Sequence, residues 1–444
     1  MKSLFQYRLL ALGLWAAAVS VGPAQSYSFT TIAGLAGVSG TNDGANSDAR
    51  FFSPSELTLD DAGAIYVSDM LNHAIRKITP VGTNWLVSTV AGLPGSVGAA
   101  DGTNTDARFN RPEGLKFDRN GNLFVADLYN HMIRKIAPVG TNWAVSTIAG
   151  LTAVRGSSDG TNTDARFWSP RGLAVDSSNR VYVADSQNFT IRGITQYGTN
   201  WVVSTLAGQV TNFGFADGKN LHALFNTPFG MTVDSEGTLF VVDLGNNAIR
   251  QITPLGPDWD TLTIANWYGT LGTNDGAGRQ ATFNFPNAIT VDGAHNLYVT
   301  DQGNNTIRKM TPGSKDWSVS TLGGVPLQRG TNDGVGGQAR FSKPWGIAVD
   351  GQGNLFIADN LNHTIRKGTP LLPAAPALEI TATPNQAVLS WPAAATNFLL
   401  ETTGTLVPPA AWTPLTNGVV VAGGACFLTN SMAGPTAFYR LHEQ

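Results

Sequence analysis

The histidines of this 444-residue chain are the first residues to test for chemistry, because imidazole nitrogens commonly bind zinc. His73, His131 and His363 each follow an asparagine, and they are separated by multiples of 58 residues. They therefore occupy one position of a repeated unit. Around a ring of such units, equivalent atoms stand on the order of 10 Å apart, whereas Zn–N bonds are about 2 Å long. We predict that these histidines are structural and that they bind no metal.

Aspartates and arginines recur with the same period and could supply paired carboxylates for acid–base work. Six equivalent copies cannot form one active site, however, and semi-buried charges need partners. We therefore predict a hydrogen-bonded pair that ties each hairpin. The aspartates end a predicted strand, and each arginine follows seven residues later: Asp69, Asp127, Asp185, Asp243, Asp301 and Asp359, with Arg76, Arg134, Arg192, Arg250, Arg308 and Arg366.

A second series of aspartates precedes glycine at the same spacing. Its members are Asp43, Asp101, Asp159, Asp217, Asp275 and Asp333. Aspartate before glycine suits turn capping, which is the role that we predict. A calcium loop is the alternative, although the carboxylate-rich spacing of an EF-hand is absent.

Candidate nucleophiles lack the context that their chemistry needs. Gly156-Ser-Ser-Asp-Gly160 has the Gly-x-Ser-x-Gly pattern, but no helix is expected after it, as a nucleophile elbow requires. Cys426 is the single cysteine, and we interpret it as a buried apolar residue because no histidine motif accompanies it. The chain has neither a His-Glu-x-x-His motif nor a phosphate-binding loop that ends Gly-Lys-Ser/Thr.

Short strands must position these residues. In residues 109–150, four runs of mainly β-branched and aromatic residues alternate with Gly, Asn, Asp and Pro, and nothing shows a helical period over ten residues. Six such units follow one another in a single 58-residue register. Four strands per unit and six units predict an all-β fold, a six-bladed β-propeller with four-stranded blades.

The repeat resembles a known family. Gly-Asn-Leu-Phe-Val-Ala-Asp-(x2)-Asn-His-(x)-Ile-Arg-Lys, at 121–135, looks like the NHL repeat of six-bladed propellers. The stretch Asp-Gly-(x4)-Ala-Arg-Phe-(x2)-Pro-(x)-Gly, at 101–114, looks like its longer variants in secreted bacterial proteins. The resemblance covers residues 27–370 and implies the fold, whereas a fold of this kind hosts many functions.

The ring has to be closed by the two ends of the repeat region. The sixth copy stops at Pro370 without a fourth strand. Residues 27–34 match the fourth strand of the first copy, because each of them lies 58 positions before its counterpart in that strand. We predict that 27–34 is the closing strand of blade six, beside Thr364–Gly368. Closure would remove two unpaired sheet edges.

Three further segments flank the propeller. Residues 1–24 have the charged start, short apolar run and small-residue end of a signal peptide. Residues 371–376 are predicted to form a short stiff linker. Residues 377–444 are predicted to form a small β-sandwich module, which resembles a fibronectin type III domain and which we expect to space or attach the propeller.

Composition and charge exclude several classes of partner. The net charge is −3, the pI is about 6.1 and charged residues make up 13% of the chain, so no basic field exists for a nucleic acid and no polybasic run for a membrane. One cysteine allows no intrachain disulfide. We expect no membrane span after signal removal and a secreted or periplasmic, cell-envelope location.

One position escapes the repeat and is the candidate site. The residue after each repeated proline differs in every copy: Ser55, Glu113, Arg171, Phe229, Asn287 and Trp345. These residues precede the innermost strands, so we expect them around the mouth of the central channel. They should bind a ligand there from an exposed rim, where substitutions cost roughly 0.5 kcal/mol or less. Neutral drift of an exposed loop is the alternative.

The leading functional hypothesis is a non-enzymatic exported module that binds a protein, peptide or saccharide ligand and needs no cofactor. One alternative is an enzyme resembling the gluconolactonase-like propellers, which hold one divalent cation on the axis. Glu56, Glu113 and Asn287 are its candidate ligands, and Glu56 and Ala288 replace a glycine of the other four copies. A pure scaffold or spacer is the other alternative.

Overall fold

The computed structural model describes residues 25–371 and, beyond them, 378–382, 386–392, 398–405, 411–415, 417–422, 425–431 and 437–443. The predicted signal peptide at 1–24 and the predicted linker after Leu371 lie outside the described residues. Residues Ser26–Leu371 form one compact unit, and the described residues after them belong to a second unit. Across the described ranges, no helix is both long and apolar enough to cross a membrane.

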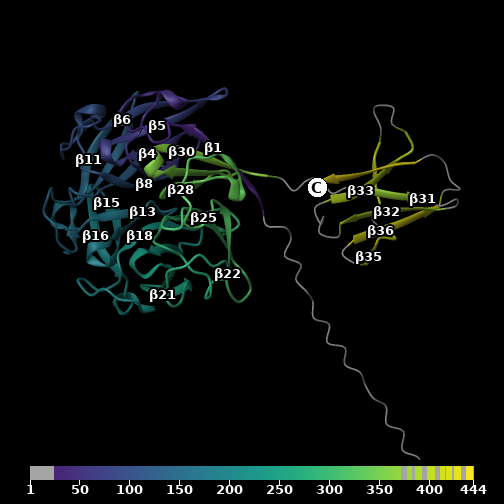
Figure 1. Ribbon diagram of the computed structural model, residues 1–444. Coiled ribbons are helices and arrows are strands. Elements are labelled where there is room, and N and C mark those ends of the chain that lie inside the picture. Colours follow the sequence, from purple (N-terminus) through teal and green to yellow (C-terminus); the bar gives the residue numbers. More distant parts are fainter. Residues whose placement is uncertain are drawn as a thin grey trace, which may run out of the picture. The chain divides into compact units, whose positions relative to one another are not determined.

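The larger unit is a ring of six antiparallel sheets, which confirms the six-bladed β-propeller (Figure 1). We number the blades in chain order by their inner strands. The inner strands are β3 (Pro54–Leu59), β8 (Pro112–Phe117), β13 (Pro170–Val175), β18 (Pro228–Val233), β23 (Pro286–Val291) and β28 (Pro344–Val349). Each contacts the inner strand of the next blade, and β28 contacts β3, so the ring is closed.

The next two strands of each blade form the hairpin that the repeated Asp and Arg residues flank. The second strands are β4 (Ile65–Asp69), β9 (Leu123–Asp127), β14 (Val181–Asp185), β19 (Leu239–Asp243), β24 (Leu297–Asp301) and β29 (Leu355–Asp359). The third strands are β5 (Ala74–Val81), β10 (Met132–Val139), β15 (Thr190–Tyr197), β20 (Ala248–Leu255), β25 (Thr306–Thr311) and β30 (Thr364–Pro370).

Each sheet has one more strand than the four that we predicted, because part of the Asp-Gly segment pairs with the fourth strand. The fourth strands are β6 (Asn84–Ala91), β11 (Asn142–Gly150), β16 (Asn200–Ala207), β21 (Asp258–Ala265), β26 (Ser318–Gly323) and β1 (Tyr27–Ala33). The fifth strands have two residues each: β2 (Gly44–Ala45), β7 (Gly102–Thr103), β12 (Gly160–Thr161), β17 (Gly218–Lys219), β22 (Gly276–Ala277) and β27 (Gly334–Val335).

Short 3-10 turns are the helical elements of the propeller. One group follows the fifth strands: η1 (Asn46–Asp48), η3 (Asn104–Asp106), η4 (Asn162–Asp164), η6 (Asn220–His222) and η8 (Gly336–Gln338). The other group joins the second and third strands: η2 (Met70–Asn72), η5 (Ser186–Asn188), η7 (Leu244–Asn246) and η9 (Asn360–Asn362).

Blade six combines both ends of the repeat region. Strand β1 pairs antiparallel with β30, with Ser28 opposite Thr369 and Phe29 opposite Gly368, and it pairs on its other side with β27. The backbone N–H and hydroxyl of Thr31 both donate to the Asp333 carboxylate, at 3.0 and 2.9 Å. Phe29 is fully buried against Gly323 and Gly368, where other copies have alanine and a larger apolar residue. This strand therefore joins residues more than 300 positions apart.

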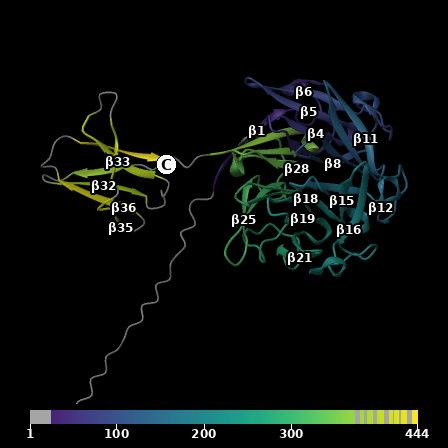
Figure 2. The same ribbon diagram turned by 180° about the vertical axis from the view of Figure 1, so that it is seen from behind.

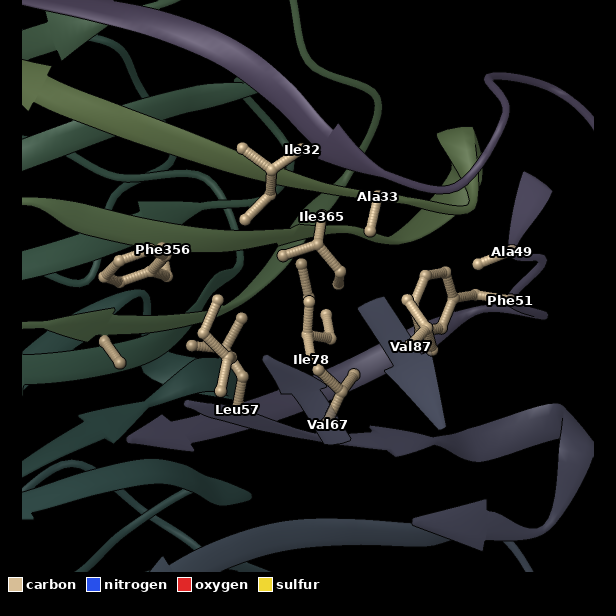
Figure 3. Packing of buried hydrophobic residues seen from close by; sticks show 13 residues of the cluster. Ile32, Ala33, Ala49, Phe51, Leu57, Val67, Ile78, Val87, Phe356 and Ile365 are labelled. Atoms are coloured by element: carbon tan, nitrogen blue, oxygen red, sulfur yellow. The ribbon is translucent and has the colours of Figure 1, made fainter. Parts of the chain in front are cut away.

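Apolar layers between neighbouring blades form the core (Figure 3). Between blades six and one, Ile32, Phe356 and Ile365 face Leu57 and Ile78, and all are buried. Burial of each such side chain contributes about 1.5–3 kcal/mol. Because strand side chains alternate between the two faces of a sheet, every blade supplies apolar residues to the interfaces on both of its sides.

Glycines let the inner strands approach one another around the axis. A Cβ atom on Gly114 would lie 1.9 Å from the Arg171 carbonyl oxygen, and one on Gly172 would lie 2.1 Å from that of Phe229. Glycine is thus required at these contacts, which explains why four of the six copies have it.

The second unit contains two sheets. One has the strand order β31 (Glu379–Ala382), β32 (Gln386–Pro392), β36 (Ala425–Ser431), β35 (Val420–Ala422), and the other has β34 (Thr413–Pro414), β33 (Phe398–Thr403), β37 (Phe438–Glu443). Buried Leu389, Trp391 and Leu428 from the first sheet cluster with Leu400 from the second. The unit is therefore a small β-sandwich, as predicted. Figure 2 shows its strands and those of the propeller from behind.

Candidate site at the channel mouth

The six non-repeating residues occupy the second position of the inner strands, where the strands of neighbouring blades meet. Ser55, Glu113, Phe229 and Asn287 are buried, and Arg171 and Trp345 are half-buried. The prediction of an exposed rim is therefore wrong for these side chains. The physical reason is that side chains of different inner strands pack against one another around the axis, as the contacts among Glu113, Arg171, Phe229 and Trp345 show.

Four of these residues form one connected series. Arg171 Nη1 donates to both carboxylate oxygens of Glu113, at 2.9 and 2.7 Å. The Arg171 guanidinium lies 4.4 Å from the centre of the Phe229 ring, a cation–π distance. The rings of Phe229 and Trp345 are 5.9 Å apart and belong to blades four and six. The series thus connects side chains of blades two, three, four and six at the mouth.

The other two members differ in their hydrogen bonding. The Ser55 hydroxyl lies 3.3 Å from the Ser68 carbonyl and 3.5 Å from the Pro112 carbonyl, so its role is structural. Asn287 is fully buried, and its Oδ1 atom accepts no hydrogen bond from any described residue. An unpaired buried amide oxygen costs about 1–3 kcal/mol, which makes Asn287 unusual.

Two further polar atoms at this position also have no hydrogen-bond partner among the described residues. They are Nε of Arg171 and Nε1 of Trp345, both N–H donors. Half of the six non-repeating residues therefore carry an unpaired buried donor or acceptor. Most of the other unpaired Nε atoms belong to the repeated arginines and recur from blade to blade, and one belongs to Arg180, which does not repeat. The three at the mouth do not recur, so the repeat does not explain them.

A second charged pair lies near this series. Burial raises the pKa of Glu56 to about 7, although the nearby Lys116 ammonium opposes the shift. Burial correspondingly lowers the pKa of Lys116, while Glu56 acts in the opposite direction. Glu56 therefore titrates near neutral pH, and perturbed groups of this kind are typical of functional sites. Lys116 was not among the predicted site residues, although its position varies among the copies and that variation was a usable signal.

Two of the three alternative cation ligands, Glu56 and Glu113, already accept hydrogen bonds from other residues. In the described part of the chain, no group of three or more His, Cys, Asp or Glu residues could hold a metal ion. Both oxygens of Glu113 accept from Arg171, and Glu56 Oε1 accepts from the Leu57 backbone at 3.2 Å. These contacts leave Asn287 Oδ1 as the unpaired oxygen of the three candidate residues.

The repeated aspartates and arginines form buried ion pairs, and each arginine binds both aspartate series. Arg76 Nη1 lies 2.7 Å from Asp69, and its Nη2 lies 2.6 Å from Asp43. The equivalent distances in the other copies are 2.6–3.0 Å. Burial raises the pKa of the Asp69 series to about 6, against the arginine charge, so these carboxylates stay ionised at neutral pH.

The Asp43 series was predicted to cap turns, and its contacts are different. Asp43 accepts from the backbone N–H and the hydroxyl of Thr89 on β6, in addition to Arg76. It therefore ties the Asp-Gly segment to the third and fourth strands. The carboxylates of both series are used within each blade rather than at a shared site.

The histidines join neighbouring blades. Nδ1 of His73, His131 and His363 accepts from the backbone N–H of Arg111, Ser169 and Ser53 of the next blade, at 3.1–3.2 Å. Burial lowers the pKa of all three, so the neutral acceptor form is favoured. Asn247 and Asn305 make the same contact through Oδ1 at 2.9 Å. These contacts give the histidines the structural role that we predicted.

Three exposed aromatic residues lie on the segment that leads from blade four into blade five. Phe285, two residues before Asn287, is 44% exposed, and Trp267 and Tyr268 are 47% and 81% exposed. The buried side chain of Asn247 holds the two segments together, because its Oδ1 accepts from the Phe285 N–H and its Nδ2 donates to the Gly269 carbonyl at 3.3 Å. No other copy has aromatic residues at these three positions. We call Trp267, Tyr268 and Phe285 the aromatic shelf.

A cavity of about 400 Å³ lies at the turns between the first and second strands, at the other end of the inner strands. It is lined by residues such as Asp118, Asp176 and Asp234. Each of these carboxylates accepts backbone N–H groups of its own turn, at 2.8–3.0 Å. These aspartates therefore build the turns, and none of the six non-repeating residues lines this cavity.

The closed ring of six sheets around an axis defines the larger unit as a β-propeller. The sequence profile of the NHL repeat matches residues 109–136, 167–194 and 341–367, and the other three copies share their register. The larger unit is therefore a β-propeller that contains NHL repeats.

Comparison with known proteins places this domain among larger proteins. The chain is 30% identical over 338 residues to Protein SUPPRESSOR OF QUENCHING 1, chloroplastic, of Arabidopsis thaliana. The aligned region covers 72% of this chain and 30% of that protein. The chain spans less than half of the length of the curated relatives that it matches.

Solved structures share the fold. A Bacteroides thetaiotaomicron protein of unknown function has a TM-score of 0.59 at 20% identity, covering 78% of this chain and 76% of that one. An auxiliary nutrient binding protein of Bacteroides ovatus has a TM-score of 0.56 at 17% identity, covering 78% of each chain. At these identities the similarity extends to the fold alone.

Proposed function

We propose that this protein is a non-enzymatic binding module whose ligand sits at the channel mouth, on Arg171, Asn287 and Trp345. The observation that supports this most directly is the set of unpaired buried polar atoms on these three residues. Unpaired donors and acceptors are costly in a protein interior, and a ligand that pairs with them would remove that penalty. Binding sites also combine an apolar lining with a few polar groups, and Phe229 and Trp345 supply the apolar part here.

Two variants of one residue type test the site. A thermal-shift screen of soluble glycans, peptides and small metabolites on the full chain first identifies a ligand. Trp345→Phe keeps an aromatic ring and removes the unpaired N–H, so it should weaken binding at least about fivefold, the loss of roughly 1 kcal/mol. Trp168→Phe, in the loop before β13 of blade three, is the matched control and should leave binding unchanged. A screen without a hit, or a ligand that is indifferent to Trp345→Phe, would overturn the proposal.

Export and attachment complete the proposal. The charged and apolar pattern of residues 1–24 supports export as a secreted or cell-envelope protein. The β-sandwich after residue 377, which we propose to be fibronectin type III-like, would space or attach the propeller. Two measurements test these roles: the mass of the mature protein recovered outside the cytoplasm should lack the first 24 or so residues, and deletion of 377–444 should leave ligand affinity unchanged.

A further inference from the structure

We infer that the groove between blades three and four binds a small carboxylic acid, whose carboxylate group pairs with the guanidinium of Arg180. This site is separate from the one proposed at the channel mouth and does not depend on it. The inference follows from a cavity in the groove, from a cation in its wall that has no ionic partner, and from two departures from the repeat that fit each other.

The groove contains a cavity of about 770 Å³. Blade three contributes Asp176 and Arg180, from the turn between β13 and β14, and part of β16. Blade four contributes Trp259, near the start of β21, and the turn before it. Sites for small ligands typically have volumes of roughly 300–1,000 Å³, so this cavity is large enough for one. None of the six non-repeating residues of the mouth lines it.

The charged side chains that line the cavity differ in their partners. Asp159 pairs with Arg192 at 2.6 Å. Asp176 accepts from the Tyr182 hydroxyl at 2.9 Å and from backbone N–H groups of its own turn. Arg180 forms no ion pair with a carboxylate of the described residues, and its Nε has no hydrogen-bond partner among them. The side chain is half-buried, so an anion that paired with it would remove part of the cost of desolvating its charge.

Two aromatic rings hold the guanidinium of Arg180. Its central carbon lies 5.3 Å from the centre of the Tyr182 ring and 5.6 Å from the centre of the Trp259 ring, which are cation–π distances. These contacts attract the cation but do not neutralise it. A guanidinium held in one place in this way is prepared for a carboxylate, which it can bind with two parallel N–H bonds.

Two departures from the repeat create this arrangement together. At the position of Arg180 the other copies have Ala, Asn or Thr, and at the position of Gly193 they have Lys or Gln. A Cβ atom on Gly193 would lie 2.6 Å from Nη2 of Arg180, so the glycine makes room for the guanidinium. In blade one the equivalent lysine, Lys77, lies 3.6 Å from Asp60 in the first turn of its own blade. Blade three thus takes its cation from another element and supplies no acidic partner for it.

The lining favours a ligand with one negative charge and an apolar body. Two carboxylates face the same cavity and repel negative charge, so the single guanidinium suits a monoanion better than a phosphate dianion. A neutral ligand would leave the guanidinium without a counter-ion. Leu221 is 52% exposed, and Pro254 and Pro257 line the cavity with it, so an aromatic or aliphatic group would cover apolar surface there.

Isothermal titration calorimetry of the full chain with phenylacetate and with hexanoate tests the inference. Phenylacetamide has the shape of phenylacetate without its charge, and it should bind at least about tenfold more weakly. Arg180→Gln should weaken the binding of both acids at least about tenfold, because their charge-assisted hydrogen bonds are lost. The matched control is Arg119→Gln, at an exposed arginine in the equivalent turn of blade two, which should change the affinity less than about twofold.

A second variant tests the cavity and keeps Arg180 in place. Leu221→Asp adds a carboxylate to the lining at a half-exposed side chain, so the fold should be retained and the affinity for both acids should fall about threefold or more. Urea unfolding shows whether Arg180→Gln is folded under the conditions of the titration. If it is not, Leu221→Asp decides the test.

The outcomes separate this inference from the proposed function. Absence of binding of both acids, equal binding of phenylacetate and phenylacetamide, or wild-type affinity in the folded variants would overturn it, and Arg180 would be a structural cation that replaces the lysine of other blades. Loss of binding in Trp345→Phe but not in Arg180→Gln would place the acid at the mouth, which supports the proposed function and overturns this inference.

Discussion

Replacement of Arg171 by alanine should destabilise the propeller strongly, although its position varies from copy to copy. The Glu113 side chain is 3% exposed and the Arg171 side chain is 21% exposed, so the change leaves a buried carboxylate without its partner. Removal of one member of a buried ion pair costs about 3–5 kcal/mol. Partial access of water to Arg171 favours the lower end, and loss of the contact with Phe229 adds about 0.5 kcal/mol. We expect the free energy of unfolding to fall by about 3 kcal/mol.

A double variant that removes both charges separates the loss of the ion pair from the exposure of an unpaired buried charge. Arg171→Met combined with Glu113→Gln removes both charges and keeps most of the volume, so it should cost only about 1 kcal/mol. Urea unfolding followed by tryptophan fluorescence measures both changes, since the chain contains 11 tryptophans. Arg119→Ala, at an exposed arginine, is the control and should stay within about 0.5 kcal/mol of wild type. If Arg171→Ala matched this control, the buried ion pair would not stabilise the fold as argued.

Three further predictions concern contacts between and within blades. Burial lowers the pKa of His131 below its ordinary 6.5, so the unfolded chain binds more protons and stability should fall as the pH drops below about 6.5. His131→Asn should keep the hydrogen bond and reduce this pH dependence in urea titrations, whereas an unchanged slope would contradict the assignment. Gly193→Lys should destabilise the propeller by about 1–3 kcal/mol, because the Arg180 guanidinium occupies the space beside Gly193. Adding Arg180→Asn gives blade three the two residues that blade two has at these positions, and it should recover most of the loss. Gly368→Ile should lower the melting temperature because Phe29 fills the space next to it, and adding Phe29→Val should compensate; no compensation would show that the two residues are independent.

The sequence by itself determined the architecture. A 58-residue register of short strand patterns, repeated six times, specifies a ring of equivalent sheets, because each copy buries its apolar faces against the next. The same arithmetic aligned residues 27–34 with the fourth strands of the other copies, and the structure pairs β1 with β30. Residues that repeat are predictable in this way because one local environment recurs six times.

Contacts between copies depend on the tertiary structure, and local patterns describe them less well. The sequence showed that position 55 and its equivalents vary, but it could not show that these side chains pack against one another around the axis. It also gave no sign that the fifth strand of each sheet would form, since two residues are too few for a periodic pattern. The partners of Asp43, which include Thr89 on another strand, were equally hidden.

The candidate site depended on the ring as a whole. Phe229 and Trp345 are 116 residues apart and belong to blades that are not neighbours, and Glu113 meets Arg171 one copy further along the chain. Position in the repeat gave the identity of these residues, whereas the curvature of the closed ring decided which of them meet. Burial of Asn287 Oδ1 without a partner likewise arises only when the inner strands of adjacent blades pack together. The physical reason is that a strand pattern encodes which face of a sheet a side chain occupies, while its neighbours across the axis come from other copies.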